Sequence, residues 1–124
     1  MPKKIIIIDH DQDTVDILTY MLTDWGYTVT GFMTLDITRV LEIKPDLILI
    51  DTWLPGNFKG AFCKELKSDE RTWNINIILL STQNNLPEIA KECLADDYLA
   101  KPFDIDDINK IVSGLINGSH VAPI

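Results

Sequence analysis

The chain has 124 residues, and its 11 basic and 19 acidic residues give a net charge of −8. This length suits one domain with a single core, and a hydrophobic content of 46% argues against disorder. So acidic a chain lacks the basic surface needed to bind nucleic acid or an anionic membrane directly, which leaves proteins and cations as the expected partners. Only the run Ile5–Ile8 is apolar near the N-terminus, too short for a signal peptide or membrane span, so we expect a cytoplasmic protein.

Short apolar runs and helical periodicity alternate from the start of the chain. The isoleucine run predicts a buried strand, which ends at Asp9. Apolar residues then recur at helical spacing, in a predicted helix that Asp13 caps and Gly26 ends. Residues 27–32 alternate and are rich in β-branched side chains, which predicts a strand near the sheet edge.

The next segments predict a short helix and then a central strand. The helix spans about residues 37–43 and ends before Pro45, because proline keeps the residue before it out of the helical conformation. Residues 47–50 are all apolar, without alternation, and run into Asp51. That pattern is typical of a parallel strand covered by helices on both faces.

The second half continues the same alternation. Its predicted elements are a helix over 60–69, a strand over 75–80, a helix that Pro87 opens, a strand over 97–100 and a helix over 105–116 that Asp104 caps. Five strands alternating with five helices predict a single α/β domain with one doubly wound, five-stranded parallel sheet. Right-handed crossovers favour the flavodoxin-like strand order 2-1-3-4-5. We expect this domain to cover residues 1–118, with a flexible tail over 119–124.

Polar residues follow four of the predicted strands. Asp9, Asp51, Ser81 and Lys101 stand at the ends of strands one, three, four and five. The carboxyl ends of parallel strands lie side by side, so these side chains should converge on one pocket. Two carboxylates that close repel each other by roughly 4 kcal/mol at an effective dielectric near 20, so the pocket should bind Mg²⁺ or Mn²⁺. A carboxylate nucleophile, a divalent ion, a lysine and a hydroxyl together suit phosphoryl transfer.

In this order the segments resemble the receiver domain of two-component response regulators, over about residues 4–117. The matching segments are Ile5–Asp9, Asp46–Asp51 with Leu54 and Pro55 after it, the hydroxyl that follows Ile77–Leu80, and Ala95–Phe103. The resemblance implies a switch that accepts a phosphoryl group on Asp51 from a histidine kinase or phosphotransfer protein and then alters binding to a downstream protein. It implies no enzyme beyond self-phosphorylation and self-dephosphorylation.

The resemblance also implies a role for each member of the site. The metal shell would consist of Asp9, Asp51 and the backbone carbonyl of Trp53. The groups that contact the phosphoryl group would be Lys101 and Ser81. The switch would consist of Ser81 and Tyr98, the tyrosine following the hydroxyl into the space that it vacates.

Three features depart from the family pattern: His10, Thr82 where the family prefers a small residue, and a loop from Pro55 to Gly60 that is one residue longer than usual. The first of them concerns the metal site. Receiver domains carry an acid directly after the first aspartate as a metal ligand, and this chain has His10. Imidazole is a poor ligand for Mg²⁺, so either Asp11 substitutes, or the affinity falls, or a softer metal is preferred. Capping of the first helix competes with metal binding for Asp11. His10 is expected at the rim of the pocket, facing solvent, and metal ligation by His10 is the alternative.

Two other functions fit part of the sequence. His10 favours a pseudo-receiver, an interaction module that works without phosphorylation. The run Asp9-His10-Asp11 also matches the first motif of haloacid-dehalogenase-like phosphatases, with Asp9 as nucleophile and Asp11 as general acid and base. That reading leaves the segment around Asp51 unexplained. Since only six residues follow Gly118, the chain is expected to be a stand-alone receiver or an excised piece of a longer regulator.

Overall fold

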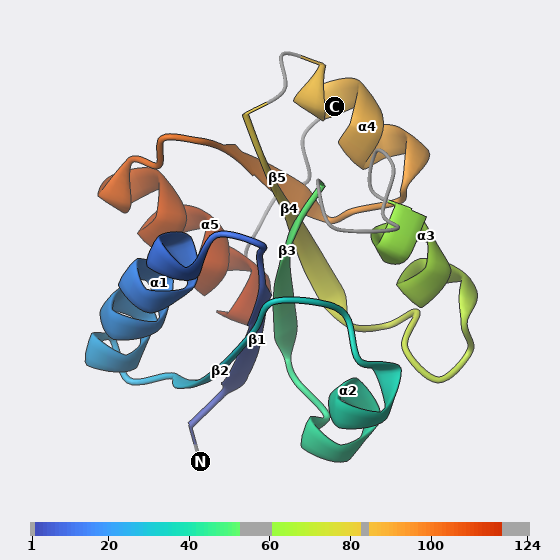
Figure 1. The fold of residues 1–124 in the computed structure, drawn as a ribbon, viewed down its shortest axis with the longest axis horizontal. Helices are drawn as coiled ribbons and strands as arrows, with labels where there is room; N and C mark the ends of the chain where they lie inside the picture. Colours follow the sequence, from blue (N-terminus) through green and yellow to red (C-terminus); the bar gives the residue numbers. More distant parts are fainter. Residues whose placement is uncertain (1, 53–60, 83–84, 118–124) are drawn as a thin grey trace.

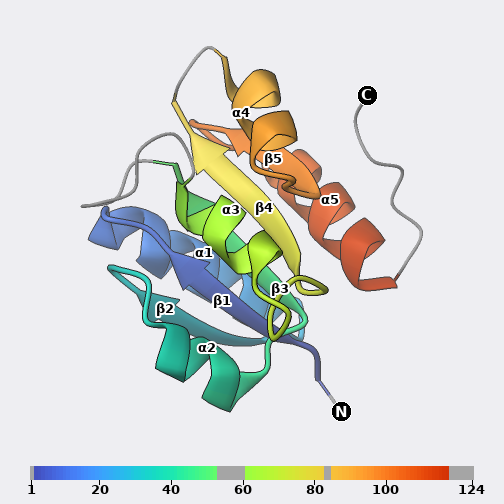
Figure 2. The ribbon, with the colours of Figure 1, turned by 90° about the vertical axis from the view of Figure 1, so that its right-hand side faces the viewer.

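The computed structural model describes residues 2–52, 61–82 and 85–117. Strands and helices alternate along these residues, in the order β1 Lys4–Ile8, α1 Gln12–Asp24, β2 Thr28–Phe32, α2 Ile37–Ile43, β3 Leu47–Asp51, α3 Ala61–Ser68, β4 Asn76–Ser81, α4 Leu86–Glu92, β5 Asp97–Ala100 and α5 Ile105–Asn117. All strand pairs are parallel, and the sheet order is β2-β1-β3-β4-β5, with β2 and β5 at opposite edges (Figure 2). The predicted doubly wound, flavodoxin-like fold is confirmed.

Helices cover both faces of the sheet, with α1 and α5 on one side and α2, α3 and α4 on the other (Figure 1). Alternate residues of the central strands enter two separate cores. Ile48 and Ile50 join the core under α2 to α4, while Leu47 and Leu49 join the one under α1 and α5. Every residue of β3 is buried, which explains the absence of alternation in its sequence. Each aliphatic side chain buried in this way contributes roughly 2 kcal/mol to folding.

The ends of the helices follow local sequence signals, with one correction. Asp11 caps α1, and the prediction that Asp13 does so is wrong. Asp11 has the extended backbone of an N-cap residue, and its carboxylate accepts hydrogen bonds from the Asp13 backbone N–H at 3.1 Å and the Thr14 hydroxyl at 3.0 Å. At the start of α5, Asp104 accepts a hydrogen bond from the Asp106 N–H at 2.8 Å, as predicted for a cap.

Helices α1 and α2 both end in the left-handed backbone region. Gly26 follows α1 with a φ of +99°, the conformation that glycine adopts at least cost. Lys44 caps α2 with a φ of 54°, directly before Pro45. Both stops were predicted from the sequence, the second because proline disfavours a helical residue before it. Within the described residues, no helix is long and apolar enough to cross a membrane.

Both cysteines are free thiols buried in the core under α2 to α4. The Cys63 thiol donates a hydrogen bond to the Cys93 carbonyl oxygen at 3.6 Å, and burial raises the pKa of Cys63 to about 12. We predict that neither thiol reacts with a disulfide reagent at pH 8 until the protein is unfolded, because the reactive thiolate is suppressed and access is blocked. Titration with and without guanidinium checks this, and rapid native-state reaction of both thiols would contradict it.

Candidate functional site

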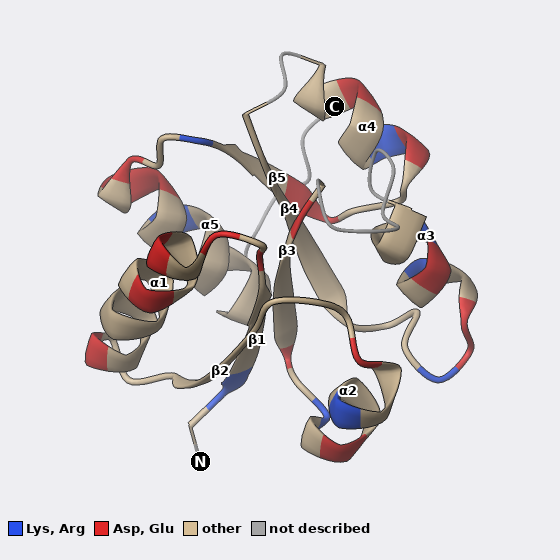
Figure 3. Cartoon of the chain, viewed as in Figure 1, with Lys and Arg blue, Asp and Glu red and all other residues tan. Residues whose placement is uncertain are grey.

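The carboxyl ends of the central strands lie together at one end of the sheet. Asp9 follows β1, Asp51 ends β3, and Lys101 follows β5. In the ladders, Asp51 pairs with Leu80, and the Lys101 backbone N–H donates to the Ser81 carbonyl at 2.9 Å. Figure 3 shows acidic segments at the ends of β1 and β3 and a basic segment after β5. The predicted convergence of the strand ends is therefore present.

A single lysine contacts both acids at this end of the sheet. Lys101 Nζ lies 2.7 Å from Asp9 Oδ2 and 3.5 Å from Asp51 Oδ2. Asp9 is fully buried and Asp51 is 2% exposed. Burial raises the pKa of Asp9, against the hydrogen bonds from Lys101 and the Asp11 backbone N–H, and the charge of Asp51 raises it further. Two desolvated carboxylates thus share one ammonium group, and a further cation would lower the energy of the site.

His10 reaches the same acids, a contact that the sequence reasoning missed. Its Nδ1 shares a hydrogen bond of 2.5 Å with Asp51 Oδ2 and lies 3.6 Å from Asp9 Oδ1. The imidazole is 42% exposed, so the expectation of a residue at the rim is right about exposure, although the ring is turned toward the acids. Within the described residues, Asp9, His10 and Asp51 form a group whose ligand atoms lie within 4.8 Å of one another, close enough for one metal ion.

Asp11 stands apart from this group. Its carboxylate faces the first turn of α1, where the hydrogen bond from the Thr14 hydroxyl is the main cause that lowers its pKa. Its backbone N–H donates to Asp9 Oδ1 at 2.9 Å. Of the two residues that could supply the missing ligand, the structure therefore brings His10 to the acids and leaves Asp11 at the helix cap.

We predict that Asp11→Ala weakens folding without weakening metal binding. The substitution leaves two donors at the start of α1 without their acceptor, while the backbone N–H that holds Asp9 remains. Urea unfolding should show a lower midpoint for Asp11→Ala than for the control Asp13→Ala, which removes an exposed acid from the same turn. Equal midpoints, or a loss of metal affinity confined to Asp11→Ala, would refute the cap assignment.

The remaining predicted site residues lie on or near β4 and β5. Ser81 ends β4, is 2% exposed and pairs with Ala100. Tyr98 lies in β5, half-buried against the core under α2 to α4. Their proposed parts in a switch remain predictions. The carbonyl of Trp53, predicted as a metal ligand, lies outside the described residues.

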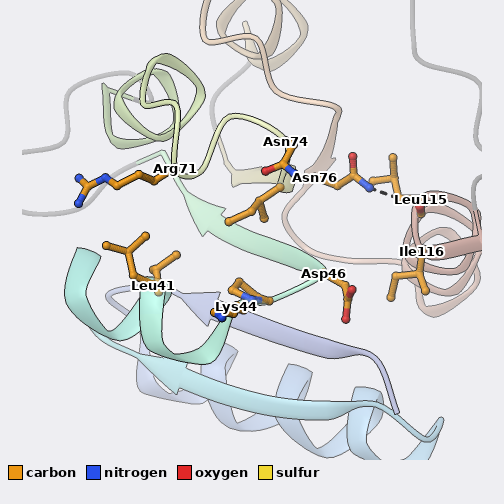
Figure 4. A pocket seen from close by; sticks show the side chains of 11 residues that line it. Leu41, Lys44, Asp46, Arg71, Asn74, Asn76, Leu115 and Ile116 are labelled. Carbon is orange, nitrogen blue, oxygen red and sulfur yellow. Dashed lines mark hydrogen bonds between the residues drawn. The ribbon is translucent and has the colours of Figure 1, made fainter. Parts of the chain in front are cut away.

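A separate cavity of about 480 Å³ lies at the other end of the strands, beside the starts of β3 and β4 (Figure 4). Its wall combines Lys44, Asp46, Arg71 and Asn76 with apolar residues from α2 and α5. Arg71 is already paired with Asp69, through hydrogen bonds of 2.7 and 3.0 Å. Because charges of both signs line the cavity and none of the strand-end acids reaches it, it does not extend the candidate site.

The parallel sheet in the order β2-β1-β3-β4-β5, with acids at its strand ends, is the arrangement of a signal-receiver domain. The family model of the response regulator receiver domain matches residues 5–113. The chain belongs to the receiver domain family of two-component response regulators.

Known relatives and solved structures agree with this assignment. The DNA-binding response regulator MtrA of Mycobacterium tuberculosis is 33% identical over 107 residues, which cover 83% of this chain and 46% of MtrA. The chain spans about half the length of the curated relatives it matches. Among solved structures, a putative response regulator from Chloroflexus aurantiacus superposes with a TM-score of 0.87 at 26% identity, covering 94% of this chain and 99% of that one.

One similar structure contains a metal ion. The receiver domain of a sensor histidine kinase from Pseudomonas aeruginosa superposes with a TM-score of 0.76 at 26% identity, covering 94% of this chain and 99% of that one. It was solved with magnesium coordinated in its active-site cleft.

Proposed function

We propose that this receiver domain is a switch that accepts a phosphoryl group on Asp51 from a histidine kinase or a histidine phosphotransfer protein. The observation that supports this most directly is the position of Lys101 Nζ, 2.7 Å from Asp9 and 3.5 Å from Asp51 at the ends of the central strands. A buried carboxylate beside a fixed ammonium group is suited to attack phosphorus and to keep the product.

In the proposed reaction, an oxygen of Asp51 forms a bond to phosphorus while the phosphorus–nitrogen bond of the donor phosphohistidine breaks. The electron pair of that bond leaves with the donor imidazole. Lys101 neutralises charge on the phosphoryl oxygens, and the hydroxyl of Ser81 donates a hydrogen bond to one of them. Tyr98 then moves toward the space that Ser81 leaves, which changes the surface offered to a downstream protein.

A divalent cation is part of this proposal. Held by Asp9, Asp51 and a third ligand, it would offset the negative charge that gathers during transfer. The magnesium in the cleft of the Pseudomonas relative supports a cation at this position. The two carboxylates fit Mg²⁺, whereas His10 in place of an acid does not.

The partners follow from charge and chemistry. A net charge of −8 disfavours direct binding to nucleic acid, so the output of this domain would be a protein contact. MtrA is a DNA-binding regulator, and this chain matches 46% of its length. Cytoplasm is the proposed compartment.

A pseudo-receiver is the second candidate, and one contact favours it. The 2.5 Å hydrogen bond from His10 Nδ1 holds the same oxygen of Asp51 that Lys101 approaches. With this contact in place, the protein itself engages the acceptor, and the domain would act through binding alone.

Intact mass spectrometry separates these two functions. The full chain is incubated with acetyl phosphate and either Mg²⁺ or Mn²⁺, and the mass is followed with time. The proposed switch gains the mass of one phosphoryl group in at least one metal. A folded protein, verified by circular dichroism, that gains none in either metal would overturn the switch and leave the pseudo-receiver.

A further inference from the structure

We propose that His10 turns the acidic pocket into a site selective for transition-metal dications of the Co²⁺, Ni²⁺ and Zn²⁺ class over Mg²⁺, with Asp9, His10 and Asp51 as protein ligands. This proposal deepens the proposed function, since it names the ion that the same site takes. It does not depend on phosphorylation of Asp51.

The geometry brings one nitrogen and two oxygen donors together. His10 Nδ1 lies 3.6 Å from Asp9 Oδ1 and 2.5 Å from Asp51 Oδ2, and all three donors fall within 4.8 Å of one another. Asp9 and His10 directly follow β1 and Asp51 ends β3, and these two strands are neighbours in the sheet. Folding alone therefore pre-assembles the three donors, although they come from positions 41 residues apart.

The groups around these donors hold the carboxylates in place. Asp9 Oδ2 accepts from Lys101 Nζ at 2.7 Å, and Asp9 Oδ1 accepts from the Asp11 N–H at 2.9 Å. Such contacts fix the orientation of metal ligands. Both acids are buried, whereas the imidazole is 42% exposed, so the donor group faces solvent on the His10 side.

The chemistry of the donors decides the selectivity. Mg²⁺ binds oxygen ligands and keeps its waters, whereas imidazole is a preferred ligand of Co²⁺, Ni²⁺ and Zn²⁺. A receiver domain with an acid at this position offers three carboxylates. In this chain His10 stands in place of that acid. The site therefore has one negative charge fewer for Mg²⁺ and one nitrogen ligand more, which the later metals favour.

The test compares selectivity ratios, because any carboxylate site prefers later metals to some degree. Co²⁺ and Mg²⁺ are titrated separately into the full, unphosphorylated chain by calorimetry. The variants are His10→Asp, which restores the acid, and His120→Ala as a control, since His120 is the other histidine of the chain. We expect His10→Asp to lower the ratio of Co²⁺ to Mg²⁺ affinity by at least about tenfold, and His120→Ala to leave it unchanged.

A second readout identifies the ligand directly. Bound Co²⁺ is paramagnetic, so it should shift the ring proton resonances of His10 strongly and should give a visible absorption band that His10→Asp alters. An unchanged ratio in His10→Asp, or a selectivity that disappears in His120→Ala, overturns the proposal. Because binding is measured without a phosphodonor, a wild type that prefers Mg²⁺ yet accepts phosphate refutes only this inference, while Co²⁺ selectivity without phosphorylation refutes only the switch.

Discussion

The Asp51→Asn variant is expected to take up no phosphoryl group, whereas the wild type takes up one. Asparagine keeps the size of the side chain and an oxygen that can accept from His10 and Lys101, but it lacks the carboxylate that attacks phosphorus. Folding should survive, because removing the charge of Asp51 also removes one cause of the raised pKa of Asp9. Intact mass after incubation with acetyl phosphate, together with circular dichroism, measures both expectations.

Two other Asp→Asn variants complete this experiment, one as a control and one as a test of the phosphatase function. Asp106→Asn changes an exposed acid in the first turn of α5 and should leave phosphate uptake at the wild-type level. Asp9→Asn distinguishes the phosphatase reading, in which Asp9 is the nucleophile and Asp51 is dispensable. Turnover of an aryl phosphate that survives Asp51→Asn but not Asp9→Asn would establish that reading. The position of Asp11 at the helix cap, away from the acids, argues against it.

The Lys101→Met variant is expected to lose about 3 kcal/mol of folding free energy near pH 7, the scale for a buried ion pair that loses one partner. Methionine keeps the unbranched aliphatic stem but leaves Asp9, which is fully buried, and Asp51 without their ammonium group. Urea unfolding measures the loss. Lys110→Met, which changes an exposed lysine of α5, is the control and should unfold like the wild type.

The pH dependence of this loss has a definite sign. The pKa of Asp9 is already raised in the folded protein, chiefly by burial, and Lys101 opposes that rise. A carboxyl whose folded pKa is raised binds its proton more tightly when folded, so stability increases as the pH falls through the folded pKa toward the unfolded value. The deficit of Lys101→Met should therefore be largest near neutral pH and shrink toward pH 4. A deficit that stays constant, or one that Asp9→Asn does not relieve, would refute the electrostatic cause.

Much of this fold follows from local sequence patterns. The unbroken apolar runs before Asp9 and Asp51 identify buried parallel strands, and Gly26 and Pro45 mark helix ends. Once the order of elements is known, topology rules bring the strand ends together, and with them Lys101. These features depend on neighbours in the sequence or on rules shared by all such sheets.

Features that depend on side-chain direction were not predicted. Asp11 and Asp13 are equally plausible caps in the sequence, and only the backbone conformation of Asp11 separates them. Nothing local indicates that the His10 ring turns inward to a carboxylate 41 residues away. The ion pair of 2.7 Å between Lys67 and Asp96 is likewise a contact between distant segments. Such contacts arise from rotamers that the packed structure selects.

The complete burial of β3 has a consequence for the register in which this strand pairs with its neighbours. A strand with one apolar face resists slippage, because a shift by one residue would expose that face, but a strand that is apolar on both sides has no such safeguard. For β3, the acids at its two ends oppose such a shift. Asp46 accepts from the Lys4 N–H at 2.8 Å just before the strand, and Asp51 closes it at the rim. A shift in either direction would place one of these acids among the apolar side chains of the sheet. The proposed phosphoacceptor therefore also helps to keep the central strand in register.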